Sequence, residues 1–319
     1  MIKSAKPLLL ALGASAAVAW LFARKRLREK MTKLPVSVGD AAAQQRFIAQ
    51  HNAFLLEFPD LKLALETMFT EAQRRISDER AHTNGAARSD EDYARATVYS
   101  LERAAYDDFA ELLILAGNGM GLGATKVVRS IYERYVHALY IAKNPSEAVV
   151  FIDHGRIERG KLINRWKEVV PERLAQDFTE DQLTHIQKEF KEAKARQKEE
   201  RCKTCDQPKT QNEWTRVDLS RMAKEVDEQA FKAYATCYLI PTLLTHATPT
   251  GLDFRIRLTG EGPEYKLLSE PEAHTAVKKG HYLILGVLSH LNTYYALRHD
   301  AEVGKRFAAF NEMWSDDAD

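Results

Sequence analysis

Apolar residues recur along most of this chain at intervals of three and four positions, which is the period of an α-helix. The clearest case is the stretch 121–144, where one side carries Ala124, Val127, Val128, Ile131, Tyr135, Ala138, Leu139 and Ala142. That side predicts a helix in the core of the molecule. A second side of the same stretch carries Leu122, Val136 and Tyr140, so we expect neighbours to cover this helix on two sides.

Similar patterns predict helices over the rest of the chain. The expected ranges are 40–58, 60–80, 89–115, 146–166, 179–201, 218–226, 231–247, 269–299 and 301–314. Capping boxes at 179–182 and 269–272 mark two of the helix starts. Pro59 should end one helix and Pro241 should bend another. The alternation in 252–259 predicts a short strand or an extended lid. The predicted fold class is all-α, a multi-helix bundle.

Residues 7–23 form a run without charge, close to the shortest helix that can cross a bilayer, roughly 17 residues. The run is followed at once by five cations, Arg24, Lys25, Arg26, Arg28 and Lys30. Cations collect on the cytoplasmic side, so we expect a single-pass protein of an inner or plasma membrane with most of the chain in the cytoplasm. The alternative is a signal peptide cleaved at 17–19, which the cations disfavour.

The same patterns divide the chain into three parts. Residues 1–30 are expected to be the membrane anchor with its basic flank, 31–88 an N-terminal helical pair, and 89–314 the helical bundle domain. Within the bundle domain, acidic and basic residues alternate over much of 178–215. This alternation predicts a charged, solvated helical arm.

Composition narrows the function only slightly. Of the 319 residues, 45% are hydrophobic and the net charge is +1. These values are typical of a globular protein and give no general reason to expect a nucleic-acid partner. Three cysteines are too few for a disulfide framework and fit a reducing compartment.

Cys202 and Cys205 form a C-x-x-C pair at the end of the charged arm. Such a pair is half of a zinc site, and Cys237, the remaining cysteine, lies in an apolar stretch. Asp206, His185 or a second copy of the chain would have to complete the site. The alternatives are a redox pair and a bare loop. Zinc is thus the one cofactor to consider, and a homo-oligomer is one way to complete its site.

Three polar residues are candidates for a functional site. Arg129 and Glu133 are four residues apart on the helix over 121–144, so they can pair. The pair is either an ordinary structural ion pair or part of a polar site between helices. His246 follows an apolar helix, where it either makes one hydrogen bond at the helix end or exchanges protons in a pocket. The glycines of 117–123 match no phosphate-binding spacing and predict a tight turn.

The residues around these candidates resemble an uncharacterised bacterial family of all-helical proteins, a domain of unknown function. The resemblance covers roughly residues 90–300 and rests on two groups of residues. The first is Arg129-x-x-x-Glu133 followed by Tyr140, and the second is Trp214, Leu219, Met222-Ala223, Tyr234, Tyr238 and Thr245-His246. It implies a helical bundle in which Arg129, Glu133 and His246 are the polar residues of the family, and it implies no established activity. A weaker similarity links Arg75 and His82 to helical-bundle nucleases, but this spacing is also expected by chance.

The function that we predict is a membrane-anchored interaction or sensing module. Residues 7–23 would bind the lipid bilayer and another surface would bind an unidentified protein. The alternative is a hydrolase acting on RNA or a phosphoester, and only this alternative brings in nucleic acid. In it, Arg129 would stabilise anionic charge while His246, with Glu133, would transfer protons.

Overall fold

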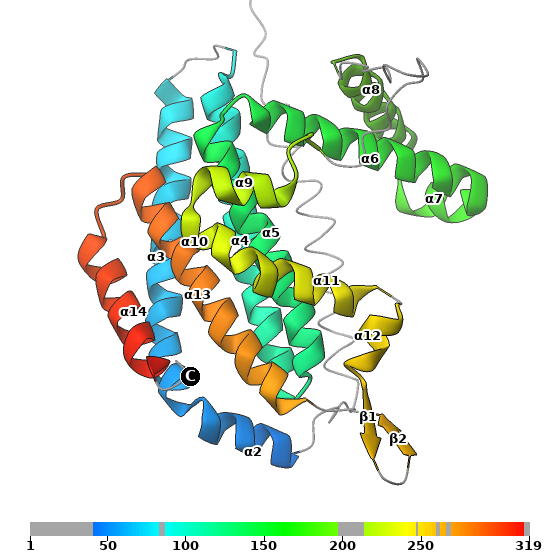
Figure 1. Ribbon diagram of the computed structural model, residues 1–319. Coiled ribbons are helices and arrows are strands. Elements are labelled where there is room, and N and C mark those ends of the chain that lie inside the picture. Colours follow the sequence, from blue (N-terminus) through cyan, green and yellow to red (C-terminus); the bar gives the residue numbers. More distant parts are fainter. Residues whose placement is uncertain are drawn as a thin grey trace, which may run out of the picture.

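A computed structural model describes residues 41–82, 87–196, 214–246, 248–259, 262–265 and 269–315. Within these ranges the chain is a multi-helix bundle with a small hairpin at one side (Figure 1). Its elements are α2 (Ala41–Gln50), α3 (Asn52–His82), α4 (Asp90–Gly117), α5 (Gly121–Lys143), α6 (Glu147–Val169), α7 (Pro171–Asp177), α8 (Glu180–Arg196), α9 (Leu219–Val226), α10 (Glu228–Tyr234), the π-helix η1 (Ala235–Leu239), α11 (Ile240–Thr245), α12 (Pro249–Asp253), β1 (Ile256–Thr259), β2 (Gly262–Tyr265), α13 (Glu270–Tyr294) and α14 (Asp300–Met313).

The core lies between α3, α4, α5 and α13, whose apolar faces meet in one continuous cluster. α5 is covered by α4 and α13, and α9, η1 and α11 also pack on it. Its residues Ile131, Tyr132 and Val136 are fully buried. The helix predicted over 121–144 is therefore present and covered on more than one side.

A glycine brings α5 against the start of α13. A Cβ added at Gly121 would collide with the carbonyl oxygen of Ser269 and the amide nitrogen of Ala273. The turn before it is tight: Gly119 has φ 73°, and its carbonyl oxygen accepts a hydrogen bond from the amide of Ser269 at 3.0 Å. The start of α5 and the start of α13 are thus in direct backbone contact.

We call α6, α7 and α8 together the arm; of the charged arm expected over 178–215, it contains the helix α8. α7 and α8 lie away from the bundle in Figure 1. It has a small core of its own, made of Ile163, Leu174 and Ile186. Helix α6 packs closely on α8, because a Cβ added at Gly160 would meet the side chain of Phe190. The first turn of α6 remains in the bundle, where Ala148 joins the main core.

Ion pairs connect the two long helices of the arm. Asp153 on α6 accepts two hydrogen bonds from Arg196 on α8, at 2.7 and 2.8 Å, and one from Arg156 at 2.9 Å. Glu189 on α8 lies 3.3 Å from Arg156. Burial acts to raise the pKa of Asp153, but the two arginines outweigh it and hold this pKa below its usual value. The charge alternation of the sequence therefore corresponds to cross-helix pairing.

One helix end differs from the expected one, and one alternative left open by the sequence is decided. Pro59 does not end a helix, because α3 continues through it, and the break comes instead between α2 and α3. A proline inside a helix costs about 3 kcal/mol, and the burial of Phe54, Leu61 and Leu65 on the same helix outweighs that cost. At 252–259 the strand alternative is correct, since β1 pairs antiparallel with β2.

The transmembrane helix expected over 7–23 lies outside the described residues. So do Cys202 and Cys205. Among the helices that the structure does describe, none is long and apolar enough to cross a membrane.

Candidate functional site

Arg129 lies at the contact between α5 and the π-helix η1. Its Cζ is 4.9 Å from the centre of the Tyr238 ring, a cation–π distance. Its Nε is 3.8 Å from the Oε2 of Glu133, too far for a hydrogen bond. Among the described residues this buried Nε has no hydrogen-bond partner. The Arg129 side chain is 24% exposed, so its charge is only partly compensated and can attract a carboxylate or a phosphate.

Tyr238, which contacts this arginine, belongs to a cluster of three tyrosines. Tyr132 donates a hydrogen bond from its hydroxyl to the carbonyl oxygen of Ala230 at 2.8 Å, and its ring contacts those of Tyr234 and Tyr238. Burial raises the pKa of Tyr132 well above its usual value, so this hydroxyl stays protonated. The cluster therefore holds the ring of Tyr238 beside Arg129, and Tyr132 offers no nucleophile.

His246 lies at the end of α11, away from the contact between α5 and η1. Contacts of Tyr132 with Ala230 and of Arg129 with Tyr238 show that α5 and the segment α10–η1–α11 run antiparallel. His246 comes eight residues after Tyr238, roughly 12 Å further along the segment at helical rise. It is exposed and forms the C-cap of α11, where its amide donates to the carbonyl oxygen of Thr242 at 3.3 Å. The structure brings Arg129 and Glu133 together but not His246.

A second polar site lies inside the bundle and was not expected from the sequence. Glu102 on α4 is fully buried and pairs with the Nδ1 of His290 on α13 at 2.5 Å. Its Oε2 has no hydrogen-bond partner in the described part of the chain. Burial raises the pKa of Glu102, and His290 offsets only part of that effect. This pair joins α4 to α13 across the core.

Two histidines in the interior are held neutral. His281 on α13 is fully buried and accepts a hydrogen bond at Nδ1 from the indole of Trp314 at 3.3 Å. His137 on α5 accepts one in the same way from Trp214. Burial lowers the pKa of His281 to about 3 and that of His137 to about 4. Both imidazoles therefore act as hydrogen-bond acceptors in the fold.

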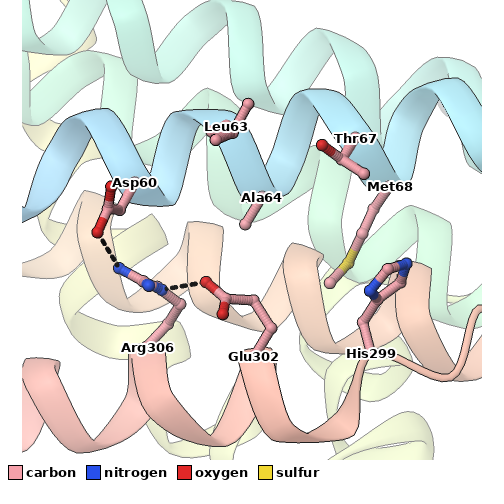
Figure 2. Close-up of a pocket in the computed structure, with 8 residues that line it drawn as sticks. All are labelled: Asp60, Leu63, Ala64, Thr67, Met68, His299, Glu302 and Arg306. Atoms are coloured by element: carbon pink, nitrogen blue, oxygen red, sulfur yellow. Dashed lines mark hydrogen bonds and ion pairs between the residues drawn. The ribbon is translucent and has the colours of Figure 1, made fainter.

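Figure 2 shows a groove of about 300 Å³ between α3 and α14. Arg306 lies along its floor and pairs with Glu302 at 2.7 Å and with Asp60 at 3.6 Å. It also pairs with Glu57 at 2.7 Å. The guanidinium is 4% exposed and has three carboxylate partners. Such a cation has little charge left for a ligand, so we interpret this groove as the joint that fixes α14 to α3.

A larger groove of about 430 Å³ lies on the arm, between α6 and α8. Its lining residues are Lys167, Leu183, Thr184, Gln187, Lys188, Lys191 and Glu192. All three lysines are exposed. Only Lys188 has a carboxylate neighbour in the groove, Glu192, at 4.0 Å. The groove therefore presents positive charge around an apolar floor at Leu183.

The described residues contain no group of three or more histidine, cysteine, aspartate or glutamate side chains placed to hold a metal ion. The zinc prediction at Cys202 and Cys205 concerns residues outside that description and stays a prediction. Of the residues that sequence reasoning missed, Glu102 had a signal: it is an acid four residues after Val98 on the apolar side of its helix. Tyr238 was part of the family resemblance, but no sequence pattern placed it beside Arg129, since they are 109 residues apart.

Comparison with known proteins gives one family. The family model described as "Family of unknown function (DUF5677)" matches residues 96–263, just over half of the chain. The matched segment contains Arg129, Glu133, Tyr238 and His246, whereas His290 lies beyond it. Searches of the curated proteins and of the solved structures give no match.

Proposed function

The chain belongs to this family of unknown function, and from that premise we propose that it is a membrane-tethered interaction protein without catalysis of its own. Residues 7–23 form the tether, and the groove on the arm binds an acidic segment of a partner protein. The observation that carries the proposal is this groove, with its three lysines around Leu183.

The build of the arm supports this role. Because the arm has its own core at Ile163, Leu174 and Ile186, a partner can bind to the arm without separating the helices of the bundle. Two of the groove's lysines, Lys167 and Lys191, have no carboxylate partner among the described residues, and the acids Asp153 and Glu189 of the arm are already paired with arginines. An acidic helix or loop would meet complementary charge there, which speeds association and fixes its orientation.

Site-directed photo-crosslinking tests the proposal. The full-length protein carries a photoreactive amino acid at Gln187, a groove residue, and is irradiated in native membranes. We expect one defined protein adduct, and its yield should fall roughly tenfold in Lys188→Glu with Lys191→Glu, because like charges repel the acidic partner. The matched control, Lys161→Glu with Lys167→Glu, reverses two lysines of α6, only the second of which lines the groove, and should lower the yield less.

Two outcomes count against the proposal. Absence of any protein adduct from Gln187, with the protein folded, removes the arm as a binding surface. An adduct that contains RNA moves the function to the nucleic-acid alternative. The partner should still be captured by Arg129→Ala, since Arg129 lies on α5 and outside the groove.

The hydrolase remains the second candidate, because Arg129 is partly exposed, its ion pair with Glu133 is 3.8 Å long, and its Nε has no hydrogen-bond partner among the described residues. The antiparallel course of α5 and α10–α11 favours the interaction role over it, since this course separates His246 from Arg129. A hydrolase predicts loss of turnover on an RNA or phosphodiester substrate in His246→Ala at an unchanged melting temperature. We expect instead that the wild-type protein and this variant are equally inactive.

A further inference from the structure

We propose that the outer side of the segment from α10 to the start of β1 is a membrane-contact surface that rests on the lipid bilayer. Six apolar side chains along this segment are 36–50% exposed: Phe231, Leu239, Ile240, Leu243, Leu252 and Ile256. We call these six residues the apolar stripe. The proposal rests on the membrane tether of the proposed function.

The stripe belongs to a stretch with an unusual composition for a surface. Residues 233–252 contain no aspartate, glutamate, lysine or arginine. The arm, by contrast, carries a charge at most of its exposed positions. Large apolar patches on soluble surfaces mark sites that contact a partner or a membrane.

The stripe cannot turn inward, because the inner side of the same segment is already packed. Cys237, Pro241 and Leu244 are buried against the bundle. The π-helix η1 also aligns the stripe: its wider turn holds one extra residue, which changes the bearing of later residues by about 100°. This shift brings Leu239 and Leu243 closer to the bearing of Phe231 than a regular α-helix would.

Charged residues of both signs border the stripe. At one end Lys232 pairs with Glu228 at 2.8 Å, and at the other end Asp253 and Arg255 follow Leu252. An uncharged centre with such a border matches the interface of a bilayer, which accepts apolar side chains and places charged ones at the level of the headgroups.

The tether makes the bilayer the nearest apolar surface. Residues 24–40 separate the uncharged run from α2 and can extend at most about 60 Å. The bundle is therefore held close to the membrane, and this confinement raises the effective concentration of lipid at the stripe.

Lipid photolabelling tests the proposal in the full-length protein. The protein is reconstituted into vesicles of phosphatidylcholine and phosphatidylglycerol that contain a phospholipid with a diazirine in its acyl chain. Trypsin cuts after Lys232 and Arg255, so the stretch 233–255 is recovered as one peptide. We expect label in this peptide and little in peptide 63–74, whose exposed Leu63 lies on α3.

A pair of variants sharpens the result. Leu239→Gln with Leu243→Gln should lower the labelling of 233–255 by roughly tenfold, because two apolar contacts with lipid are lost. The matched control, Leu56→Gln with Leu63→Gln, changes two exposed leucines of α3 and should leave that labelling unchanged. Vesicles of phosphatidylcholine alone should label 233–255 to a similar extent, because the border of the stripe carries charges of both signs.

The peptide pattern separates this proposal from the tether. Label in peptide 4–24 but not in 233–255 keeps the tether and overturns the membrane-contact surface. Label in neither peptide overturns both, and the cover of the stripe is then protein, either a second copy or residues 7–23 of the same chain. Label in both peptides supports both.

Discussion

In the bundle, Gly121 brings the start of α5 against the backbone of α13, whereas in the arm Gly160 brings α6 against the ring of Phe190. A backbone cannot move aside without shifting two helices, and in the arm the Cβ of Phe190, 2.7 Å from the added Cβ, moves only with the backbone of α8. The polar contacts are where the two regions differ. The bundle buries Glu102 and Arg306 almost completely, while the arginines that hold Asp153 in the arm are 32% and 49% exposed. Both regions are therefore closely packed at a glycine, but the ion pairs of the arm are ones that solvent and salt can weaken.

The largest expected effect is that of Gly121→Ala. The new methyl group would collide with the backbone at Ser269 and Ala273, so we expect a loss of more than about 3 kcal/mol in the free energy of unfolding. Chemical denaturation measures it. Gly304→Ala is the control, since a Cβ there meets no atom within 4 Å and alanine favours the helix. Equal stability of the two variants would contradict the packing described for α5.

Arg306→Met should have the next largest effect. The change leaves Glu57 buried without its cation, and breaking a buried ion pair costs about 3 kcal/mol or more. Because burial already raises the pKa of Glu57, this loss should shrink as the pH falls and the carboxyl is protonated. Thermal unfolding at several pH values checks both statements. A loss that does not change with pH would assign the effect to packing alone.

Low pH should destabilise the bundle through its buried histidines. Burial lowers the pKa of His281 from 6.5 to about 3, so between these pH values the histidine is protonated in the unfolded chain and neutral in the folded chain. The contribution of His281 is complete above pH 6.5 and is lost as the pH falls toward 3, which amounts to about 2 kcal/mol by pH 5.

The measurement for this histidine is the slope of unfolding free energy against pH. His281→Gln keeps an acceptor for Trp314 without the titration, so its slope between pH 6.5 and 5 should be smaller than that of the wild type. The control is Gly304→Ala, which changes no titratable group and should keep the wild-type slope. Equal slopes for all three proteins would exclude His281 as the source.

Asp153→Asn should act only in the arm. The amide cannot replace the paired hydrogen bonds to Arg196, and we expect a loss of about 1–2 kcal/mol in the local stability of α8. Hydrogen exchange should be faster in α8 and unchanged in α13, and high salt should reduce the difference between variant and wild type. Faster exchange in both helices would mean that the arm and the bundle unfold as one unit.

The smallest expected effect is that of Gly160→Ala, and it should stay within the arm. The new methyl group would collide with Cδ2 of Phe190 and lie 2.5 and 2.7 Å from its Cγ and Cβ, so α8 must shift away from α6. Such overpacking costs about 1–3 kcal/mol and the helix preference of alanine offsets up to about 1 kcal/mol, so we expect a net loss of about 1 kcal/mol in the local stability of α8. The measurement is the exchange rate of α8 amides. Faster exchange in α13 as well would remove the distinction between the two regions.

The helices could be predicted because their signals are local. Apolar spacing within 121–144 and charge alternation before Arg196 depend on residues a few positions apart. The rest of the arm predicted over 178–215 lies mostly outside the described residues and stays a prediction. Pro59 was misjudged because a local breaker competes with burial of Phe54 and Leu61, which depends on distant helices. In the site, Arg129 and Glu133 are one turn apart and were paired correctly. Glu102 and His290 are 188 residues apart, and no local pattern connects them.

The position of α13 determines which fragments of this protein can fold on their own. The family match ends at residue 263, before α13 begins, yet α13 supplies twelve buried residues to the space beside α4 and α5. A fragment restricted to the matched residues would leave that space open and expose its lining to water. We expect such a fragment to aggregate alone and to become soluble when a separate chain carrying α13 is produced with it. Recombinant work on the family segment thus requires residues that the family definition omits.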